Sequence, residues 1–485
     1  MSATSPTQPQ PRTYGNWRRG LRPGLFGFGP AATAIAFAVM VCGAGSLILS
    51  KWVALAIVVV GGLTLTPLAV RFHGRTGAQL LAARLLWLAG RRRRSHLYVT
   101  GLASPVSQAH RLPGILARSV LWEVETGLRT PLGVVVIPQS RHYSVALRCQ
   151  TDGLDLVDQP VVDQRVARMA QFLSALAREP MLVQAQVTVE TTPDPGVALA
   201  GEVARTTVEH APAAARQVLA DIVASYPVGA AHVDTWVVLT FKPPARGTWT
   251  DDAVCTEIAT RLPSLVQSLL GAGASAVNPM SGDDLALTVA AAYDPATASH
   301  AAAPGAPTWD NAGPVAAHET WDAYRHDSGT SRTWGMAEAP RGTVYANAFA
   351  RLADPDPTLL RKRVSIIYRP YSPGAAAALV ERDRRDAMFT AAKKRQATAR
   401  DNIDVQAAEQ AAREEATGAG ITRFTVLVTA TVRNPADLDD AESMTFARAG
   451  EARVTLRTMY GSQAAAFAAN LPTGVVLPHH ASLRI

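Results

Sequence analysis

The first 100 residues of this 485-residue chain contain no Asp and no Glu, although they hold 12 Lys and Arg residues. The whole chain has 47 basic and 39 acidic residues, so the remainder has 35 basic against 39 acidic ones. The positive charge therefore belongs to the N-terminal segment alone. Because a basic domain is the electrostatic signature of nucleic-acid binding, its absence from residues 101–485 argues against direct, sequence-specific contact with DNA or RNA.

The familiar catalytic motifs are missing as well. Gly is never followed by Lys, so the chain has no GxxxxGK[ST] loop to hold the phosphates of ATP or GTP. Neither GxSxG nor HExxH occurs, which excludes the common serine-hydrolase and zinc-protease signatures. We expect no catalytic residue, no cofactor and no enzymatic activity. An enzyme whose active site follows no such motif is the alternative.

Cysteine is scarce, and histidine is scattered. Cys42, Cys149 and Cys255 stand alone, and none belongs to a CxxC pair, so the sequence indicates neither a zinc site nor a disulfide framework. His479 and His480 are adjacent near the C-terminus, but no acidic residue or cysteine lies close to them in sequence. We therefore predict no bound metal.

Charge is also absent from two apolar runs, residues 30–49 and 52–70, which only Ser50 and Lys51 separate. A membrane-spanning helix needs about 20 apolar residues. The pattern predicts a transmembrane hairpin over 30–70, preceded by a basic cytoplasmic tail over 1–29. Since Lys and Arg flank the hairpin on both outer sides, both termini are expected in the cytoplasm of a multi-pass membrane protein. A cleaved signal peptide is disfavoured because a second run follows at once.

A basic cluster follows the second run, within residues 71–100. Residues 77–90 have a broad apolar face interrupted by Arg84, and Arg91, Arg92, Arg93 and Arg94 come directly after them. The pattern is typical of an interfacial helix held on an anionic lipid surface by its arginines. An ordinary domain helix followed by a solvated linker is the alternative.

The rest of the chain divides into two α+β domains, residues 101–294 and 319–485, joined by an Ala/Pro/Gly-rich linker over 295–318. In the first, residues 132–137 and 143–149 predict a strand hairpin, and residues 161–178 show helical periodicity. The second contains a long Ala-rich, charged helical region over 375–417, which we interpret as a projecting helical hairpin. Strands interleave with helices in both halves, which suggests two units of related design.

Four aromatic residues lie in and after the linker: Trp309, Trp321, Tyr324 and Trp334. Trp and Tyr are enriched in the residues that dominate protein interfaces, so these four are candidate partner contacts. A hairpin that closes the second domain explains the same pattern equally well.

Several segments together resemble a known family. They include HGRTG at His73–Gly77, RRRRSHLY at Arg91–Tyr98, HYSVALRC at His142–Cys149 and DLVDQPVVDQRVARM at Asp155–Met169. In these the chain resembles actinobacterial membrane proteins encoded with conjugative-transfer genes, which carry a PrgI-like two-span head similar to a small inner-membrane subunit of type IV secretion systems.

The C-terminal stretch RVTLRTMYGSQAAAFAANLPTG, Arg453–Gly474, is similar to the end of the N-terminal, non-motor domain of TraC/CagE-type conjugation ATPases. In those proteins a motor domain follows, and here the sequence ends at Ile485. The resemblance implies a membrane-anchored scaffold of a conjugative apparatus that docks a separate ATPase chain and other channel subunits, in an oligomeric assembly and in contact with membrane lipids. A type VII secretion component of the EccE kind is the alternative.

Overall fold

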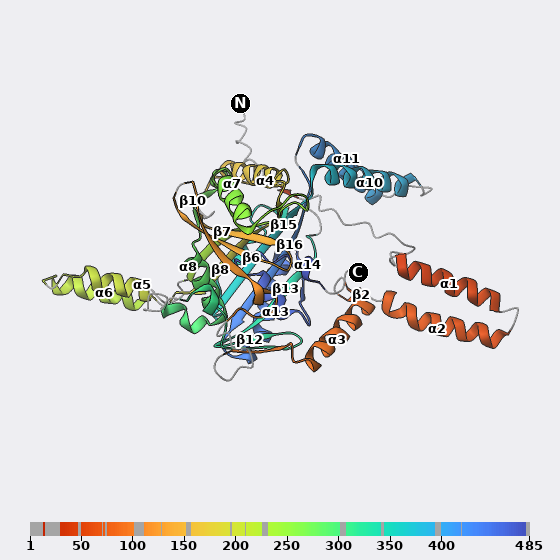
Figure 1. Ribbon diagram of the computed structural model, residues 1–485, viewed down its shortest axis with the longest axis horizontal. Coiled ribbons are helices and arrows are strands. Elements are labelled where there is room, and N and C mark those ends of the chain that lie inside the picture. The colour runs from red at the N-terminus through yellow and green to blue at the C-terminus, as the bar shows by residue number, and fades with distance from the viewer. Residues whose placement is uncertain are drawn as a thin grey trace, which may run out of the picture.

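A sheet-centred body and several projecting helical hairpins make up the molecule (Figure 1). The computed structural model describes residues 13–14, 30–46, 50–69, 71–72, 75–100, 111–127, 129–151, 157–194, 196–208, 210–225, 231–300, 307–340, 344–392, 399–418 and 420–481. Within these ranges the body is an α+β fold on a 13-stranded sheet whose strand pairs are all antiparallel.

The two apolar runs form a pair of helices, α1 (Pro30–Ser46) and α2 (Lys51–Ala69), that pack on each other. A Cβ on Gly61 would lie 2.4 Å from Cγ2 of Val39, so glycine permits this close approach. However, no helix in the described part of the chain is both long and apolar enough to cross a bilayer. Helix α1 has only 17 residues, about 26 Å at 1.5 Å per residue, against about 30 Å of hydrocarbon.

The prediction of a transmembrane hairpin over 30–70 is therefore wrong, and so is the prediction of a multi-pass membrane protein. The basic tail over 1–29 falls almost entirely outside the described residues, apart from the short strand β1 (Thr13–Tyr14), which pairs with β14 (Val344–Tyr345).

Helix α3 (Gly77–Arg92) leads from the hairpin to the body. Short strands β2 (Arg71–Phe72) and β3 (Arg75–Thr76) precede it. Thr76 begins the helix with a capping box, in which its hydroxyl accepts from the Gln79 amide while the Gln79 side chain accepts from the Thr76 amide. Strand β4 (Leu97–Val99) follows, and joins one edge of the main sheet.

The strand order across the sheet is β4-β11-β12-β13-β16-β15-β8-β9-β7-β6-β5, with β10 also paired to β7 and β17 to β13. The bounds in the N-terminal half are β5 (Val120–Glu125), β6 (Pro131–Ile137), β7 (His142–Thr151), β8 (Leu182–Pro193), β9 (Ala231–Phe241) and β10 (Ala274–Pro279). Those in the C-terminal half are β11 (Ala316–Glu319), β12 (Tyr324–His326), β13 (Gly329–Glu338), β15 (Arg361–Pro370), β16 (Thr422–Val432) and β17 (Thr455–Thr458).

The described helices either cover the two faces of the sheet or project from it (Figure 1). In the N-terminal half they are η2 (Gly114–Arg118), α4 (Gln159–Leu176), α5 (Val197–Thr206), α6 (Ala213–Ser225), α7 (Asp251–Gly271) and α8 (Gly282–Tyr293). The linker contains η3 (Pro295–His300). In the C-terminal half they are η4 (Trp309–Asn311), α9 (Ala350–Ala353), α10 (Pro373–Ala392), α11 (Ala399–Ala416), η5 (Pro435–Asp437), α12 (Leu438–Glu451), α13 (Gln463–Ala469) and α14 (Leu477–His480).

The two halves repeat one topology. Residues 114–293, the first repeat, run η2-β5-β6-β7-α4-β8-α5-α6-β9-α7-β10-α8. Residues 309–469, the second repeat, run η4-β11-β12-β13-α9-β15-α10-α11-β16-α12-β17-α13, with only β14 and η5 added. The strand orders β5-β6-β7-β9-β8 and β11-β12-β13-β16-β15 match, as do the pairs β10 with β7 and β17 with β13. Each repeat carries a helical hairpin between corresponding strands.

Equivalent backbone details support the correspondence. The Met280 amide donates to the Ala146 carbonyl at 2.9 Å, and the Met459 amide donates to the Thr333 carbonyl at 3.1 Å. The first bond holds the connection between β10 and α8, and the second holds the corresponding connection between β17 and α13. The two repeats meet where β8 pairs with β15, and Thr188 stands opposite Ser365 near the middle of that ladder. An antiparallel pair has a local twofold axis, so the repeats are related by a pseudo-twofold axis near this point.

The repeats also interlock. Helix α8 of the first repeat contacts η4 of the second, and α13 of the second contacts η2 of the first. One apolar core on this face spans both repeats and contains Leu285 and Phe467 among its members. The opposite face has a separate core in each repeat, one beneath α4 and α7, and the other beneath α9 and α12. The strands of the two predicted domains thus join in one sheet.

Candidate interaction surface

The basic cluster predicted from the sequence lies on α3 and just beyond its C-terminus. Arg84, Arg91, Arg92, Arg93 and Arg94 are all exposed. The apolar side chains of the same helix are exposed too, among them Leu81 and Leu85. Contact between these arginines and lipid headgroups stays a prediction, and it concerns the surface of α3 only.

Trp321 joins α3 to the body. Its ring stacks on Tyr460 with centroids 5.6 Å apart and lies edge-on to Trp87 of α3 at 5.5 Å. The Arg84 guanidinium carbon lies 4.5 Å from the Trp321 ring centroid and 4.9 Å from that of Trp87, and Arg91 lies 5.5 Å from Trp87. Such cation–π contacts each contribute roughly 0.5–1 kcal/mol at exposed sites. The basic cluster is thereby fixed to the second repeat.

The other three predicted aromatic contacts lie inside the body. Trp334 is fully buried on β13, where it packs against Phe446. Tyr324 is buried beside Phe467. Trp309 is buried as well, and its Nε1 donates to the Ser119 hydroxyl at 3.2 Å. Of the four, only Trp321 reaches the surface. Sequence inspection missed its partners Trp87 and Tyr460, because they lie far from it along the chain.

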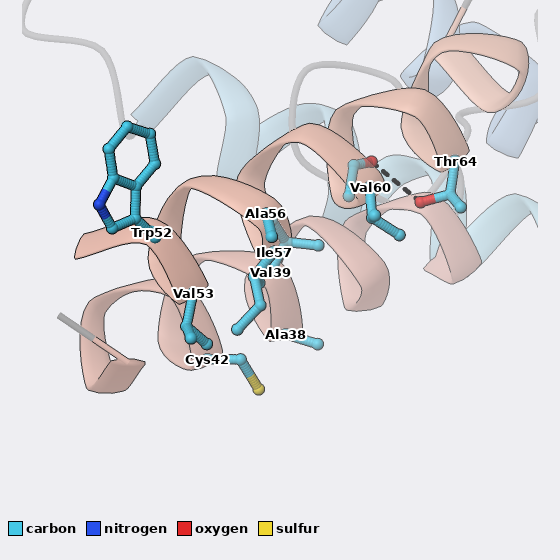
Figure 2. Close-up of a pocket in the computed structure, with 10 residues that line it drawn as sticks. Ala38, Val39, Cys42, Trp52, Val53, Ala56, Ile57, Val60 and Thr64 are labelled. Carbon is cyan, nitrogen blue, oxygen red and sulfur yellow. Dashed lines mark hydrogen bonds between the residues drawn. The ribbon is translucent and has the colours of Figure 1, made fainter. Parts of the chain in front are cut away.

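The α1–α2 hairpin presents the largest cluster of exposed apolar side chains. Leu63 is 76% exposed and Trp52 is 71% exposed. An open groove of about 630 Å³ runs between the helices (Figure 2). It is lined by Ala38, Val39, Cys42, Trp52, Val53, Ala56, Ile57, Val60, Gly61 and Thr64. Contiguous exposed apolar surfaces are typical of sites that contact proteins, membranes or ligands.

Two further helical hairpins project from the body, α5–α6 and α10–α11 (Figure 1). They interrupt corresponding positions of the two repeats, between β8 and β9 and between β15 and β16. Because β8 and β15 are antiparallel, the hairpins leave opposite ends of the central strand pair. Both carry exposed apolar residues, including Val218 on α6 and Phe389 on α10, which is 68% exposed. We call these two hairpins the arms.

A buried ion cluster lies beside the joint between the repeats. The Glu190 carboxylate accepts hydrogen bonds from Arg361 and Arg363, and all three residues are buried. Burial by itself would raise the pKa of Glu190, but the two guanidinium groups hold it below its usual value. Arg363 also lies over the Phe467 ring, 5.2 Å from its centroid. The cluster therefore ties the β8–β15 ladder to the core shared by both repeats.

Neutral polar side chains beside the Glu190 cluster also connect β8 to β15. Thr188 and Ser365 share a hydrogen bond of 2.6 Å across β8 and β15, and Gln186 donates to both hydroxyls. Asn470, just after α13, accepts from Ser365 and donates to Thr429 at 2.8 Å. A one-residue slip of the ladder would break these contacts, so they fix the register between the repeats.

The C-terminal segment closes over the first repeat. The Gly474 carbonyl accepts from Thr240, which is bonded in turn to Ser144 at 3.1 Å. His479 lies beyond it, with its Nδ1 3.0 Å from Nε2 of His142. Burial, followed by repulsion from His479, Lys242 and His480, lowers the pKa of His142 to about 4. The LPTG stretch thus packs as part of the body.

Two buried groups with lowered pKa values, His326 and Lys362, have structural partners. Burial lowers the pKa of His326 to about 4, and its ring nitrogens lie 2.5 Å from the Tyr293 carbonyl and 2.7 Å from Ser331 Oγ. Burial likewise lowers the pKa of Lys362 to about 8, and its ammonium donates to the Asp354 carbonyl at 2.6 Å. Among the residues with a described placement, no group of three or more His, Cys, Asp or Glu could hold a metal ion.

The comparisons with known proteins bear on the N-terminal segment only. Residues 21–79 match a family described as a domain of unknown function (DUF8461), a stretch that includes α1, α2 and the start of α3. No functionally characterised protein in the curated collection matches the chain.

Proposed function

We propose that this chain is a non-catalytic scaffold subunit of a conjugative DNA-transfer apparatus of the type IV secretion kind. It holds a separate cytoplasmic ATPase chain and other channel subunits in an oligomeric assembly. The observation that carries the proposal is the arrangement of the molecule: a rigid body from which the arms and the α1–α2 hairpin project, each with exposed apolar side chains.

The interior of the body supports a structural role. Buried charged and polar groups bond to each other in the Glu190 cluster and along the β8–β15 joint, although the two terminal nitrogens of Arg363 have no hydrogen-bond partner in the described part of the chain. Buried networks of this kind can fix one arrangement of a core. The resemblance at 453–474 supports the choice of partner, because in the ATPases that it resembles the equivalent segment belongs to the domain beside the motor.

The groove between α1 and α2 is assigned to an apolar helix of a channel subunit. A helix that lays its apolar face into a groove is a common mode of recognition between proteins. The groove is lined almost entirely by apolar side chains, with Thr64 as its only hydroxyl, and that hydroxyl donates to the Gly61 carbonyl at 2.9 Å (Figure 2).

The test is purification of the tagged chain from the native host while the transfer genes are expressed, followed by identification of co-eluting chains. The proposal expects a transfer ATPase and at least one channel subunit. Phe389→Ser on an arm and Val60→Ser in the groove should each deplete a subset of these partners. Ser328→Ala, far from both, is the control. Reproducible absence of any ATPase or channel subunit would contradict the proposal.

A further inference from the structure

Strand β5 ends the sheet on the side of the first repeat. It pairs with β6 on one side, and no strand in the described part of the chain pairs with its other side. Its sequence VLWEVE contains neither Lys nor Pro, the residues that commonly protect a sheet edge from further pairing. Within the described residues, the outer backbone groups of β5 therefore have no strand partner.

The backbone groups that face outward can be assigned. Thr126 donates to the Thr130 carbonyl at 3.0 Å, so this pair is hydrogen-bonded across the β5–β6 hairpin. Hydrogen-bonded and non-hydrogen-bonded pairs alternate along an antiparallel ladder. Leu121, Glu123 and Glu125 are accordingly in non-hydrogen-bonded pairs, and their amides and carbonyls point away from β6.

The corresponding edge in the second repeat is already covered. Strand β4 pairs with β11, with Tyr98 opposite Ala317. The Glu319 amide donates to the His96 carbonyl, and the Thr100 amide donates to the Val315 carbonyl, both at 2.9 Å. Strand β4 is thus a short extended segment that adds to the β11 edge of the second repeat by antiparallel pairing.

The ladders relate the two edges residue by residue. Leu121 pairs with Val135, which pairs with Ser144, which pairs with Thr240. In the second repeat, Glu319 pairs with Tyr324, then Ser331, then Thr431. The last pair in each series is a Ser and a Thr whose hydroxyls are hydrogen-bonded, Ser144 with Thr240 and Ser331 with Thr431. Leu121 is therefore the counterpart of Glu319, and Ser119 is the counterpart of Ala317.

A cavity lies where an added strand would place an aromatic side chain. In the second repeat, Tyr98 stands opposite Ala317, and its hydroxyl donates to the Arg111 carbonyl just before η2. At the β5 edge, a cavity of about 170 Å³ lies between η4 and the segment that leads into β5. It is lined by Arg111, Leu112, Leu116, Ala117, Arg118, Ser119, Val120, Trp309 and Asp310. Since η4 is the counterpart of η2, the cavity occupies the place corresponding to the Tyr98 ring.

We propose that the outer edge of β5 binds an extended segment of a partner protein by antiparallel strand addition. The segment places an aromatic residue opposite Ser119, beside the cavity, where the Ser119 carbonyl accepts from the amide of that residue while the Ser119 amide keeps its bond to the Leu116 carbonyl. Basic residues four and six positions before the aromatic residue face Glu123, whose carboxylate also accepts from the Gly282 amide at 3.0 Å, and Glu125. This surface is independent of the ATPase-docking proposal, because it follows from the repeat alone.

The probe is a fluorescent peptide with the sequence of residues 92–100, RRRSHLYVT, added to the full chain. Fluorescence anisotropy should report saturable binding. N-methylation of the tyrosine amide, which would face β5, should weaken binding by about tenfold or more. N-methylation of the preceding leucine, whose amide would face away, is the matched control and should change binding little. Alanine in place of the tyrosine should also weaken binding by about tenfold.

On the protein, Ala117→Phe fills the mouth of the cavity and should weaken peptide binding, while Phe389→Ala on the distant arm should not. Absence of saturable binding overturns the proposal, and so does equal loss from the two N-methylated peptides. Sedimentation of the chain alone as a dimer whose β5 edge is protected from hydrogen exchange also overturns it, because a second copy would then cover the edge.

Discussion

Glu190 is the residue on which the joint between the repeats most depends. Its carboxylate is the acceptor for two buried arginines, so Glu190→Ala leaves two buried positive charges without their partner. Breaking a buried ion pair in this way costs about 3–5 kcal/mol. We expect this loss in the free energy of unfolding from urea denaturation at pH 7. Glu202→Ala, which removes an exposed pair with Arg205, should cost less than about 1 kcal/mol. Similar losses for the two variants would contradict the account.

The same carboxylate gives a pH dependence with a definite sign. Because its folded-state pKa lies below the ordinary value of 4.5, its contribution to stability is present above that pH. The contribution is lost as the pH falls through the lower, folded-state pKa.

His326 gives a separate loss of stability as the pH falls, in a pH range above that of Glu190. Burial lowers its pKa from 6.5 to about 4, so the unfolded chain binds a proton first as the pH falls below 6.5. Between pH 6.5 and 5 this linkage should destabilise the fold by about 2 kcal/mol. His326→Gln should remove that part of the pH dependence, measured by denaturation at both pH values. An unchanged difference between the two would show that His326 is not the group responsible.

Gly474 tests the packing of the C-terminal segment. Its φ is +65°, and an added Cβ would lie 2.0 Å from Ser144 Oγ. The left-handed backbone and the overlap together should make Gly474→Ala cost roughly 2–4 kcal/mol in thermal or chemical denaturation. Gly374→Ala is the matched control, since a Cβ there meets no atom within 4 Å. A tolerated Gly474→Ala would mean that the segment is not packed as described.

At the scale of single elements, the attachment of α3 rests on one aromatic contact set. Trp321→Ala removes the ring held between Tyr460, Trp87 and Arg84. Helix α3 should then open more often, and trypsin should cleave at Arg91–Arg94 several-fold faster, as followed by mass spectrometry. Phe389→Ala, an exposed aromatic elsewhere, should leave the cleavage rate unchanged. Equal rates of tryptic cleavage in the two variants would show that Trp321 does not hold α3 against the body.

Local patterns predicted many elements well. The helix predicted over 161–178 is α4, Gln159–Leu176, and the hairpin at 132–137 and 143–149 is β6 with β7. Both follow from short-range periodicity. The helical region at 375–417 contains α10 and α11, which pack on each other. By contrast, Trp309, Tyr324 and Trp334 resemble surface contacts in sequence and are buried, because burial depends on distant strands.

At the scale of the whole molecule, the sequence carried little information on how the halves combine. The joint is the β8–β15 ladder, which pairs residues such as Thr188 and Ser365, 177 positions apart. Pairings at such separations leave no periodic signal. The interleaving of strands and helices suggested two units of related design, but the residue-by-residue correspondence was hidden, because counterparts such as Val135 and Tyr324 agree in position and not in residue type. The two apolar runs led to the wrong prediction of a transmembrane hairpin, because apolar composition alone does not establish a helix that is long enough to cross a bilayer.

The central structural claim is that two repeats interlock into one body through α8 with η4, α13 with η2, and β8 with β15. It is tested by inserting a specific protease site between Ala302 and Ala303 of the full chain and cutting it. The account predicts that the two fragments co-elute as one species of unchanged hydrodynamic radius and melt in one transition at close to the uncut temperature. Fragments that separate on the column without denaturant, or that melt independently, would contradict it.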